Sequence, residues 1–292
     1  MSDRAFDYNT AFASNLGLLT SEEQAILRQA TVAIPGMGGV GGAHLLTLTR
    51  LGIGGFTIAD HDNFELRNMN RQLGATTGTL GRPKTAVMAE MARAINPELS
   101  IRTFPEGIHA RNIDEFLEGS RIVVDGLDFF RIDARRLLFR RARERGLTVV
   151  TCGPLGFGVA MLIFTPEGPS FDEFFAIRDG MDELEQLARF AVGLAPAALH
   201  LPYIDARSVS FRDQRGPSSI VAINLCAAVA ATEVISALLK RRKPWAVPGY
   251  AHFDAYRLRF RKGTLPLGNR HPWQQLKLWY LKRKLRHDFS AK

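Results

Sequence analysis

Short apolar runs alternate with longer amphipathic stretches along the first 164 residues of this chain of 292 residues. The short runs, which we expect to be β-strands, are 31–34, 56–59, 100–104, 121–125, 147–152 and 158–164. The longer stretches, which we expect to be helices, are 43–51, 84–95, 112–117 and 132–145. Strands that alternate with helices predict a mostly parallel sheet with helices on both faces, which is a doubly wound, Rossmann-like α/β fold.

The regions on either side of this alternation have different patterns. Thr20 and Glu23 have the spacing of a helix capping box, which predicts a helix near the N-terminus. The prolines after residue 164 predict irregular structure rather than further strands. The expected divisions are 1–30, an N-terminal helical segment; 31–260, the main domain, with a crossover excursion over 165–217 and an apolar helix over 219–239; and 261–292, a basic amphipathic tail.

Charge is distributed unevenly along the chain. The net charge is +9, and residues 240–292 contain 15 of the 38 Lys and Arg residues but only two of the 29 acidic ones. The basic excess therefore lies in the last fifth of the chain. Such a tail suits a nucleic acid, an anionic membrane or an acidic protein, although a solvated basic helix explains it equally well.

Composition excludes several classes of protein. An apolar content of 46% and a charged content of 23% are ordinary for a globular protein. Two cysteines without a Cys-x-x-Cys motif argue against a disulfide framework and a structural zinc site. We find neither a signal-peptide pattern nor 18 uninterrupted apolar residues, and therefore expect a cytoplasmic protein.

A glycine-rich turn separates the first two expected strands. Its glycines, Gly36, Gly38, Gly39 and Gly41, allow a tight turn and a close approach of the backbone to phosphate, at the start of a helix. Asp60 ends the second strand, where a carboxylate can accept hydrogen bonds from ribose hydroxyls. This part of the chain therefore predicts a nucleotide site.

Further polar residues distinguish this site from an ordinary dinucleotide site. Asp62, Arg71 and Lys84 all follow Asp60 within 25 residues. Two acids, an arginine and a lysine around one nucleotide suit a triphosphate with a metal better than a hydride carrier. A nicotinamide oxidoreductase remains the weaker alternative.

Taken together, these motifs resemble the ThiF/MoeB family, the adenylyltransferases related to ubiquitin-activating enzymes, over about residues 10–160. The resemblance implies binding of ATP and magnesium, and attack of a substrate carboxylate on the α-phosphate to give an acyl-adenylate and pyrophosphate. It rests on Gly36-x-Gly38-Gly39-x-Gly41, Asp60-x-Asp62, Asn68-x-Asn70-Arg71-Gln72, Gly81-x-x-Lys84 and Asp125-x-x-Asp128.

The resemblance also implies roles for individual residues. Arg71 and Lys84 would neutralise phosphate charge as the α–β bond breaks, and Asp128 would hold magnesium; we favour Asp128 over Asp125, which suits a strand-end cap. The remaining members of the expected ATP site are Gly36, Gly38, Gly39 and Gly41 in the phosphate turn, Asp60 at the ribose, Asp62 beside it, and Asn68 or Gln72 orienting phosphate or ribose.

The chain departs from the family pattern at three points. Ser14 stands where the family has an arginine that reaches into the partner subunit's ATP site, with Arg4 or Arg28 as possible substitutes, and Phe129 replaces an asparagine after Asp128. A thioester cysteine is missing from 165–216. We therefore expect adenylation without a covalent thioester step. We also expect Cys152 and Cys226 to be mainly unreactive, and His44 to be a packed core residue.

The resemblance implies a homodimer that activates the C-terminal carboxylate of a small ubiquitin-like or carrier protein or peptide. Two alternatives remain: adenylation of a modified nucleoside in tRNA, with the tail as an RNA grip, or a nucleotide-binding protein that has lost catalysis. Residues 270–292 combine tryptophans with Lys and Arg, which suits contact with nucleic acid or an anionic membrane, or packing on the domain or a dimer partner.

Overall fold

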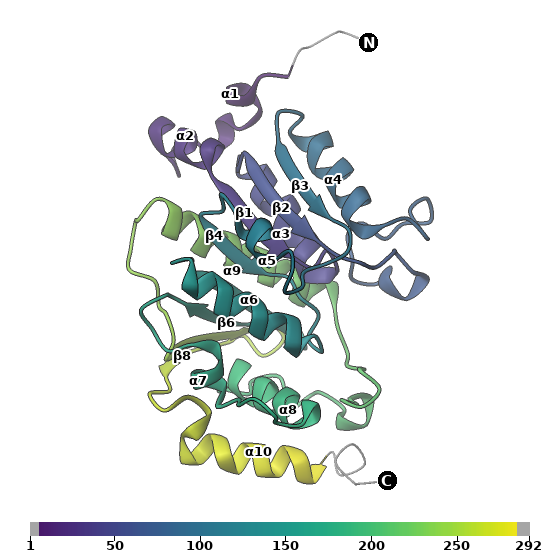
Figure 1. The fold of residues 1–292 in the computed structure, drawn as a ribbon, viewed down its shortest axis with the longest axis vertical. Helices are drawn as coiled ribbons and strands as arrows, with labels where there is room; N and C mark the ends of the chain where they lie inside the picture. Colours follow the sequence, from purple (N-terminus) through teal and green to yellow (C-terminus); the bar gives the residue numbers. More distant parts are fainter. Residues whose placement is uncertain (1–5, 285–292) are drawn as a thin grey trace.

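The computed structural model describes residues 6–284. Its centre is one eight-stranded sheet with the strand order β3-β2-β1-β4-β5-β6-β7-β8 (Figure 1). The strands are β1 (Thr31–Pro35), β2 (Gly55–Ala59), β3 (Ser100–Phe104), β4 (Ile122–Asp125), β5 (Val149–Leu155), β6 (Gly158–Phe164), β7 (Gly249–Asp254) and β8 (Arg259–Thr264).

The sheet has a parallel part, β1 to β5, and an antiparallel part, β6 to β8. Helical crossovers join β1 to β5, and these five strands are parallel. Only Gly156 and Phe157 separate β5 from β6, so these two strands form an antiparallel hairpin, and β7 and β8 continue antiparallel. The expected mostly parallel, doubly wound sheet is confirmed.

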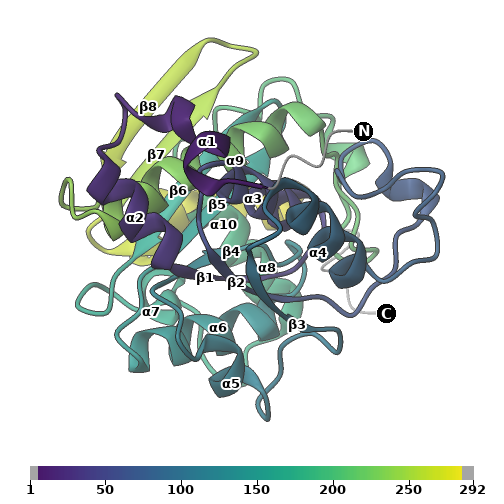
Figure 2. The same ribbon diagram turned by 90° about the horizontal axis from the view of Figure 1, so that it is seen from above.

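Alternate residues of the strands enter two hydrophobic cores, one on each face of the sheet. Figure 2 shows helices on both sides of the strands. One face is covered by α2 (Ser21–Gln29), α3 (Gly39–Arg50), α4 (Lys84–Ile95) and α9 (Ile220–Leu238). The other is covered by α5 (Ile113–Leu117), α6 (Ile132–Glu144), α7 (Phe171–Phe175), α8 (Glu183–Leu194) and α10 (Pro272–Lys284).

The N-terminal segment contains α1 (Tyr8–Ala11), the 3-10 turn η1 (Ala13–Asn15) and α2. The predicted capping box is present: the Thr20 hydroxyl accepts from the Glu23 amide, and the Glu23 carboxylate accepts from the Thr20 amide. The prediction of helix near the N-terminus is therefore confirmed for the described residues.

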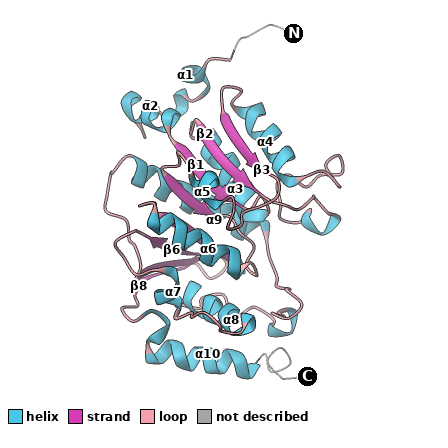
Figure 3. Cartoon of the chain, viewed as in Figure 1, coloured by secondary structure: helices cyan, strands magenta, loops and turns pink. Residues whose placement is uncertain are grey.

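Two expectations require correction. The first helix after the glycine turn begins at Gly39 rather than at 43, because the glycines lie inside its first turn. The region 165–217 is not uniformly irregular: it contains α7, α8 and the 3-10 turn η3 (Ala206–Ser208) (Figure 3). We did not predict α8 because the surrounding prolines indicated irregular structure. In this helix Asp182 is the N-cap, and Leu187 and Phe190 are buried.

The expected apolar helix is α9, which lies against α3, β5 and β6. It is the one helix within residues 6–284 whose length and composition would suit a membrane span, and half of it is buried in this fold. At the opposite end of the molecule from α1, α10 packs on α8 (Figure 1). The Gln274 and Lys277 side chains donate to the carbonyls of Val192 and Pro196.

Candidate nucleotide-binding site

The turn between β1 and α3 has no room for side chains. Gly36 has φ +87°, and its amide donates to the Ala59 carbonyl at 2.6 Å. A Cβ on Gly41 would overlap the Gly36 carbonyl oxygen, and one on Gly126 would lie 2.8 Å from the Cα of Gly41. Because no side chain caps α3 at Gly38, the amides of its first turn remain available to an anion.

Asp60 holds this turn to the end of β2. One carboxylate oxygen accepts from the Met37 amide at 2.6 Å, and the other accepts from the Asp62 amide at 2.8 Å. The carboxylate is partly buried and lies at the edge of the sheet where the parallel strands end. It is thus fixed beside the turn, as a ribose-binding acid would need to be, and the ribose contact itself stays a prediction.

Lys84, the first residue of α4, is almost fully buried, and its ammonium lies 2.8 Å from the Asp62 carboxylate. Asp62 is the exposed partner, with 55% of its side chain accessible against 7% for Lys84. Partial burial alone would raise the pKa of Asp62. The hydrogen bond and charge of Lys84, together with His61 and Arg131, nevertheless hold this pKa below its ordinary value. The Lys84 ammonium and the Asp62 carboxylate therefore form a close ion pair just after Asp60.

The Asn68–Gln72 segment lies against the glycine turn. The Arg71 guanidinium donates to the Arg67 carbonyl and the Asn70 side chain, and it makes no ion pair within residues 6–284. Asn68 is buried and accepts from the Glu65 amide at 2.9 Å. Gln72 is also buried, and its amide nitrogen lies 3.5 Å from where a Cβ on Gly38 would stand.

The amide oxygen of Gln72 has no hydrogen-bond partner in the described part of the chain. Buried polar atoms in folded proteins are nearly always paired, and an exception calls for a physical explanation. Its position beside Gly38 is the place expected for a side chain that binds a ligand on the turn.

The two acids after β4 have different surroundings. Asp125 is buried, pairs with Arg135 at 2.8 Å and accepts from the Thr151 hydroxyl. Asp128 is exposed, accepts from the Phe130 amide at 3.0 Å and makes no ion pair among the described residues. A carboxylate without a cation partner is the oxygen donor that Mg²⁺ prefers, so Asp128 fits the expected metal and Asp125 does not.

Two residues that the sequence reasoning missed join these loops. The His61 ring lies 3.4 Å from the Asp62 carboxylate, and the Arg131 guanidinium lies 3.4 Å from the His61 ring. Asp60, His61 and Asp62 place their ligand atoms within 4.8 Å of one another. The sequence did contain a signal for His61, because it stands between two acids, Asp60 and Asp62, at the end of a strand. For Arg131 the only signal was its position three residues after Asp128.

The departures from the family pattern are also placed. Ser14 is exposed in η1, and Arg28 pairs with Glu98 and stacks on Tyr8, while Arg4 lies outside the described residues. The Phe129 ring packs against Phe190 and Phe211 instead of offering a polar contact.

His44 is fully buried, as predicted, and burial lowers its pKa to about 4. Burial raises the thiol pKa of both Cys152 and Cys226, which agrees with two unreactive cysteines.

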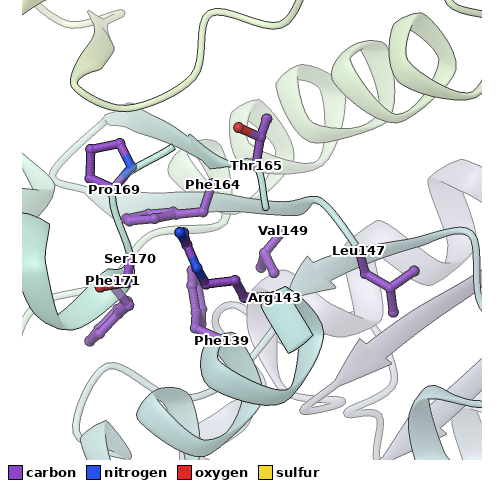
Figure 4. Close-up of a pocket in the computed structure, with 9 residues that line it drawn as sticks. All are labelled: Phe139, Arg143, Leu147, Val149, Phe164, Thr165, Pro169, Ser170 and Phe171. Carbon is purple, nitrogen blue, oxygen red and sulfur yellow. The ribbon is translucent and has the colours of Figure 1, made fainter. Parts of the chain in front are cut away.

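A separate hollow lies at the amino end of β5, at the opposite edge of the sheet from the glycine turn (Figure 4). Arg143 borders it and donates to the Gly168 carbonyl. None of the predicted site residues lines this hollow, so it is distinct from the candidate nucleotide site. Its lining is Phe139, Arg143, Leu147, Val149, Phe164, Thr165, Pro169, Ser170 and Phe171.

The fold and the candidate nucleotide site define the class of protein. It is a doubly wound α/β protein with a glycine turn, a strand-end acid and a buried lysine at the carboxyl ends of its parallel strands. The ThiF family model matches residues 12–273, and the chain belongs to the ThiF family. The resemblance inferred over residues 10–160 is confirmed and extends through α9 and the last two strands.

The chain is 34% identical over 154 residues to the tRNA threonylcarbamoyladenosine dehydratase of Haemophilus influenzae, covering 52% of this chain and 58% of that protein. It is 29% identical over 150 residues to the SAMP-activating enzyme E1 of Haloferax volcanii, covering 51% and 55%. The matches thus span little more than half the length of these curated relatives.

Solved structures share the fold at low identity. PaaA has a TM-score of 0.67 at 20% identity, with 90% of this chain and 85% of that chain covered. Escherichia coli MccB with ATP has a TM-score of 0.64 at 17% identity, with 90% and 74% covered.

Proposed function

We propose that this protein uses ATP to adenylate a substrate carboxylate. The observation that carries the proposal is the set of groups gathered at one sheet edge: the uncapped start of α3, the buried Lys84 and the exposed Asp128. A carboxylate oxygen would attack the α-phosphorus, and the bond to the bridging oxygen would break so that pyrophosphate leaves. The solved structures of E. coli MccB with ATP and of E. coli TcdA with AMP support the choice of nucleotide.

The residues of this chain would act by position and charge. The amides of the glycine turn would bind phosphate, and Asp60 would accept from the ribose. Lys84 and Arg71 would stabilise the charge that develops as pyrophosphate departs. Mg²⁺, when bound through Asp128, would neutralise phosphate oxygens.

The comparisons favour a nucleoside substrate over the carrier-protein C-terminus that the sequence alone placed first. Proteins named tRNA threonylcarbamoyladenosine dehydratase match this chain at 34% and 30% identity. Carrier and peptide substrates stay in consideration because other matches are a SAMP-activating enzyme and MccB with MccA. We therefore propose a carboxylate on a modified tRNA nucleoside as the first acceptor to test.

The outer face of α10 supports an RNA substrate. Trp273, Trp279 and Tyr280 are exposed there, and the Arg283 guanidinium lies over the Trp279 ring. Aromatic rings interleaved with cations suit stacking on bases and contact with phosphates. Residues 285–292, the rest of the predicted basic tail, lie outside the described residues. A homodimer remains part of the proposal.

The test is transfer of label from Mg·[α-³²P]ATP, with pyrophosphate release measured in parallel. Bulk tRNA, a carrier protein ending in a free carboxylate and the same carrier with an amidated C-terminus would be the acceptors. Acceptor-dependent pyrophosphate release supports the proposal. Binding of Mg·ATP with no pyrophosphate release on any acceptor would favour a nucleotide-binding protein without catalysis. The departures from the family pattern at Ser14 and Phe129 are what suggest this alternative.

A further inference from the structure

Arg135, on the inner face of α6, contacts an unusually large part of the loop that carries Asp128. Its side chain is 3% exposed. The guanidinium donates to the Asp125 carboxylate at 2.8 Å and to the backbone carbonyls of Leu127 at 2.7 Å, Asp128 at 3.1 Å and Phe129 at 3.3 Å. One side chain therefore contacts the end of β4 and three successive residues of the loop after it.

These contacts determine the shape of the loop. A guanidinium is planar and offers five donors in a rigid fork, so it can hold several acceptors in a fixed relative arrangement. With the carbonyls of three successive residues directed at Arg135, the loop wraps around the guanidinium. The Asp128 side chain then stands on the outside, where it is exposed and oriented by the Phe130 amide.

The Arg135 guanidinium also contacts α8, in the 165–217 excursion that follows the β5–β6 hairpin. It lies 4.6 Å from the centre of the Phe190 ring on α8, and Phe129 packs on that ring at 5.2 Å. The residue that replaces the family's asparagine is thus part of this contact. Arg135 and Phe129 together attach the Asp128 loop to the 165–217 excursion.

We propose that Arg135 is a positioning residue for Asp128: it holds the loop in the conformation in which the carboxylate binds the metal of the nucleotide complex. This inference rests on the proposed ATP site. A purely structural ion pair with Asp125 would use one or two donors, whereas most of the donors here go to the carbonyls of the loop.

The test compares Arg135→Lys with Arg136→Lys, a change of the neighbouring half-buried arginine that pairs with Asp172 and Asp179 on the other side of α6. Lysine keeps a positive charge beside Asp125 but cannot reach three carbonyls. The measured quantities are the Kd for AMP, the Kd for ATP in EDTA and the Kd for ATP with Mg²⁺. Amide hydrogen exchange of residues 126–131 without ligand is the second readout.

In the wild type, Mg²⁺ should strengthen ATP binding, and Asp128→Ala should abolish this gain. In Arg135→Lys we expect the gain to fall by about 10-fold to 100-fold, as for other groups that orient a metal ligand, with AMP affinity unchanged. Exchange in 126–131 should accelerate in Arg135→Lys and stay at the wild-type rate in Arg136→Lys.

A folded Arg135→Lys protein with the wild-type gain from Mg²⁺ would overturn the inference, as would equal losses of AMP and Mg·ATP affinity. If Arg135→Lys does not fold, Asp125→Asn combined with Arg135→Gln removes both buried charges and is expected to show the same selective loss. If the wild type binds neither AMP nor ATP, the proposed function fails, and unchanged exchange in 126–131 would then separately refute the positioning role.

Discussion

At the scale of residues, the chemistry of the site depends on which charges are already paired within the protein. Lys84 is buried against Asp62, and Asp125 is buried against Arg135, whereas Asp128 and Arg71 have no ion-pair partner in the described region. The unpaired groups are free to meet phosphate and metal. Of the paired groups, Asp125 and Arg135 hold the loop that presents Asp128.

Lys84→Ala should reduce the rate of pyrophosphate release by about 10²-fold to 10³-fold, the range seen when one donor to a developing charge is removed. AMP affinity should change little, because the glycine turn and Asp60 are untouched. Arg82→Ala is the matched control: Arg82 lies two residues earlier and pairs with Glu90 on the surface. Equal rates in the two variants would show that Lys84 does not act in the chemistry.

Buried histidines should make stability depend on pH. Burial lowers the pKa of His44 and His252 to about 4, although Asp125 and Asp254 respectively oppose the shift and His200 adds to it at His252. Between about pH 6.5 and 4 the unfolded chain binds the protons that the folded chain excludes. The stabilisation is therefore complete above pH 6.5 and is lost as the pH falls, by at most about 1.4 kcal/mol per pH unit for each histidine.

Urea unfolding between pH 7.5 and 4.5 would measure this dependence. Replacing His44 by Leu should reduce the slope, and replacing the exposed His109 by Gln should leave it as in the wild type. A slope that is the same in all three proteins would contradict the account.

These residues also show how far the sequence could be interpreted. The positions of Asp60, Lys84 and Asp128 follow from local motifs. The pairing of Asp125 with Arg135 does not, because it depends on how α6 turns its inner face towards the end of β4. Arg135 was one arginine among many in an amphipathic helix, with no local signal that set it apart.

At the scale of elements, regular periodicity was predictable and context-dependent pairing was not. α4, β3 and β6 begin and end where the pattern placed them. β7 and β8 were not predicted because β8 is an exposed, basic edge strand without an apolar alternation. The start of α3 was placed too late because glycine lowers helix propensity, whereas here Gly41 is needed inside the helix for close packing on the Gly36 carbonyl.

Two neighbouring glycines test this packing argument. In Gly41→Ala the new methyl group would overlap the Gly36 carbonyl, which is backbone and cannot move aside, so we expect a loss of about 1–3 kcal/mol or more and loss of nucleotide binding. In Gly42→Ala the nearest atom is the Met88 Cε at 3.2 Å, the end of a flexible side chain. Its stability should change by no more than about 1 kcal/mol. Equal effects in thermal unfolding would refute the argument.

At the scale of the whole molecule, the nucleotide edge and the basic α10 are separate parts of one fold. The last strand and α10 bear many of the basic residues, and α10 is held to α8 through Gln274 and to Pro196, just after α8, through Lys277. This arrangement leaves the Trp279 and Arg283 face of α10 open to a partner. The sequence predicted the charge and, as one of its alternatives, packing of the helix on the domain. It did not identify α8 as the surface on which the helix packs, because α8 lies in the proline-rich region where we expected irregular structure.

If α10 binds tRNA, the affinity should fall steeply with salt because phosphate contacts release counterions. Arg283→Ala should remove one phosphate contact, and the slope of log K against log salt should therefore become less steep by about 0.7 to 0.9. Arg28→Ala, which removes a surface arginine near α1, is the control. Filter binding between 50 and 200 mM salt measures both, and identical slopes would argue against an RNA role for α10.

The measurement that tests the central claim most directly is thermal unfolding with Mg·ATP, AMP, NAD and NADP in parallel, for the wild type and Asp128→Ala. A ligand at 100 times its Kd adds about 2.7 kcal/mol to stability. We predict stabilisation of the wild type by AMP and Mg·ATP, and loss of the magnesium-dependent part in Asp128→Ala. Stabilisation by NAD or NADP alone would contradict the account and leave an ordinary dinucleotide fold.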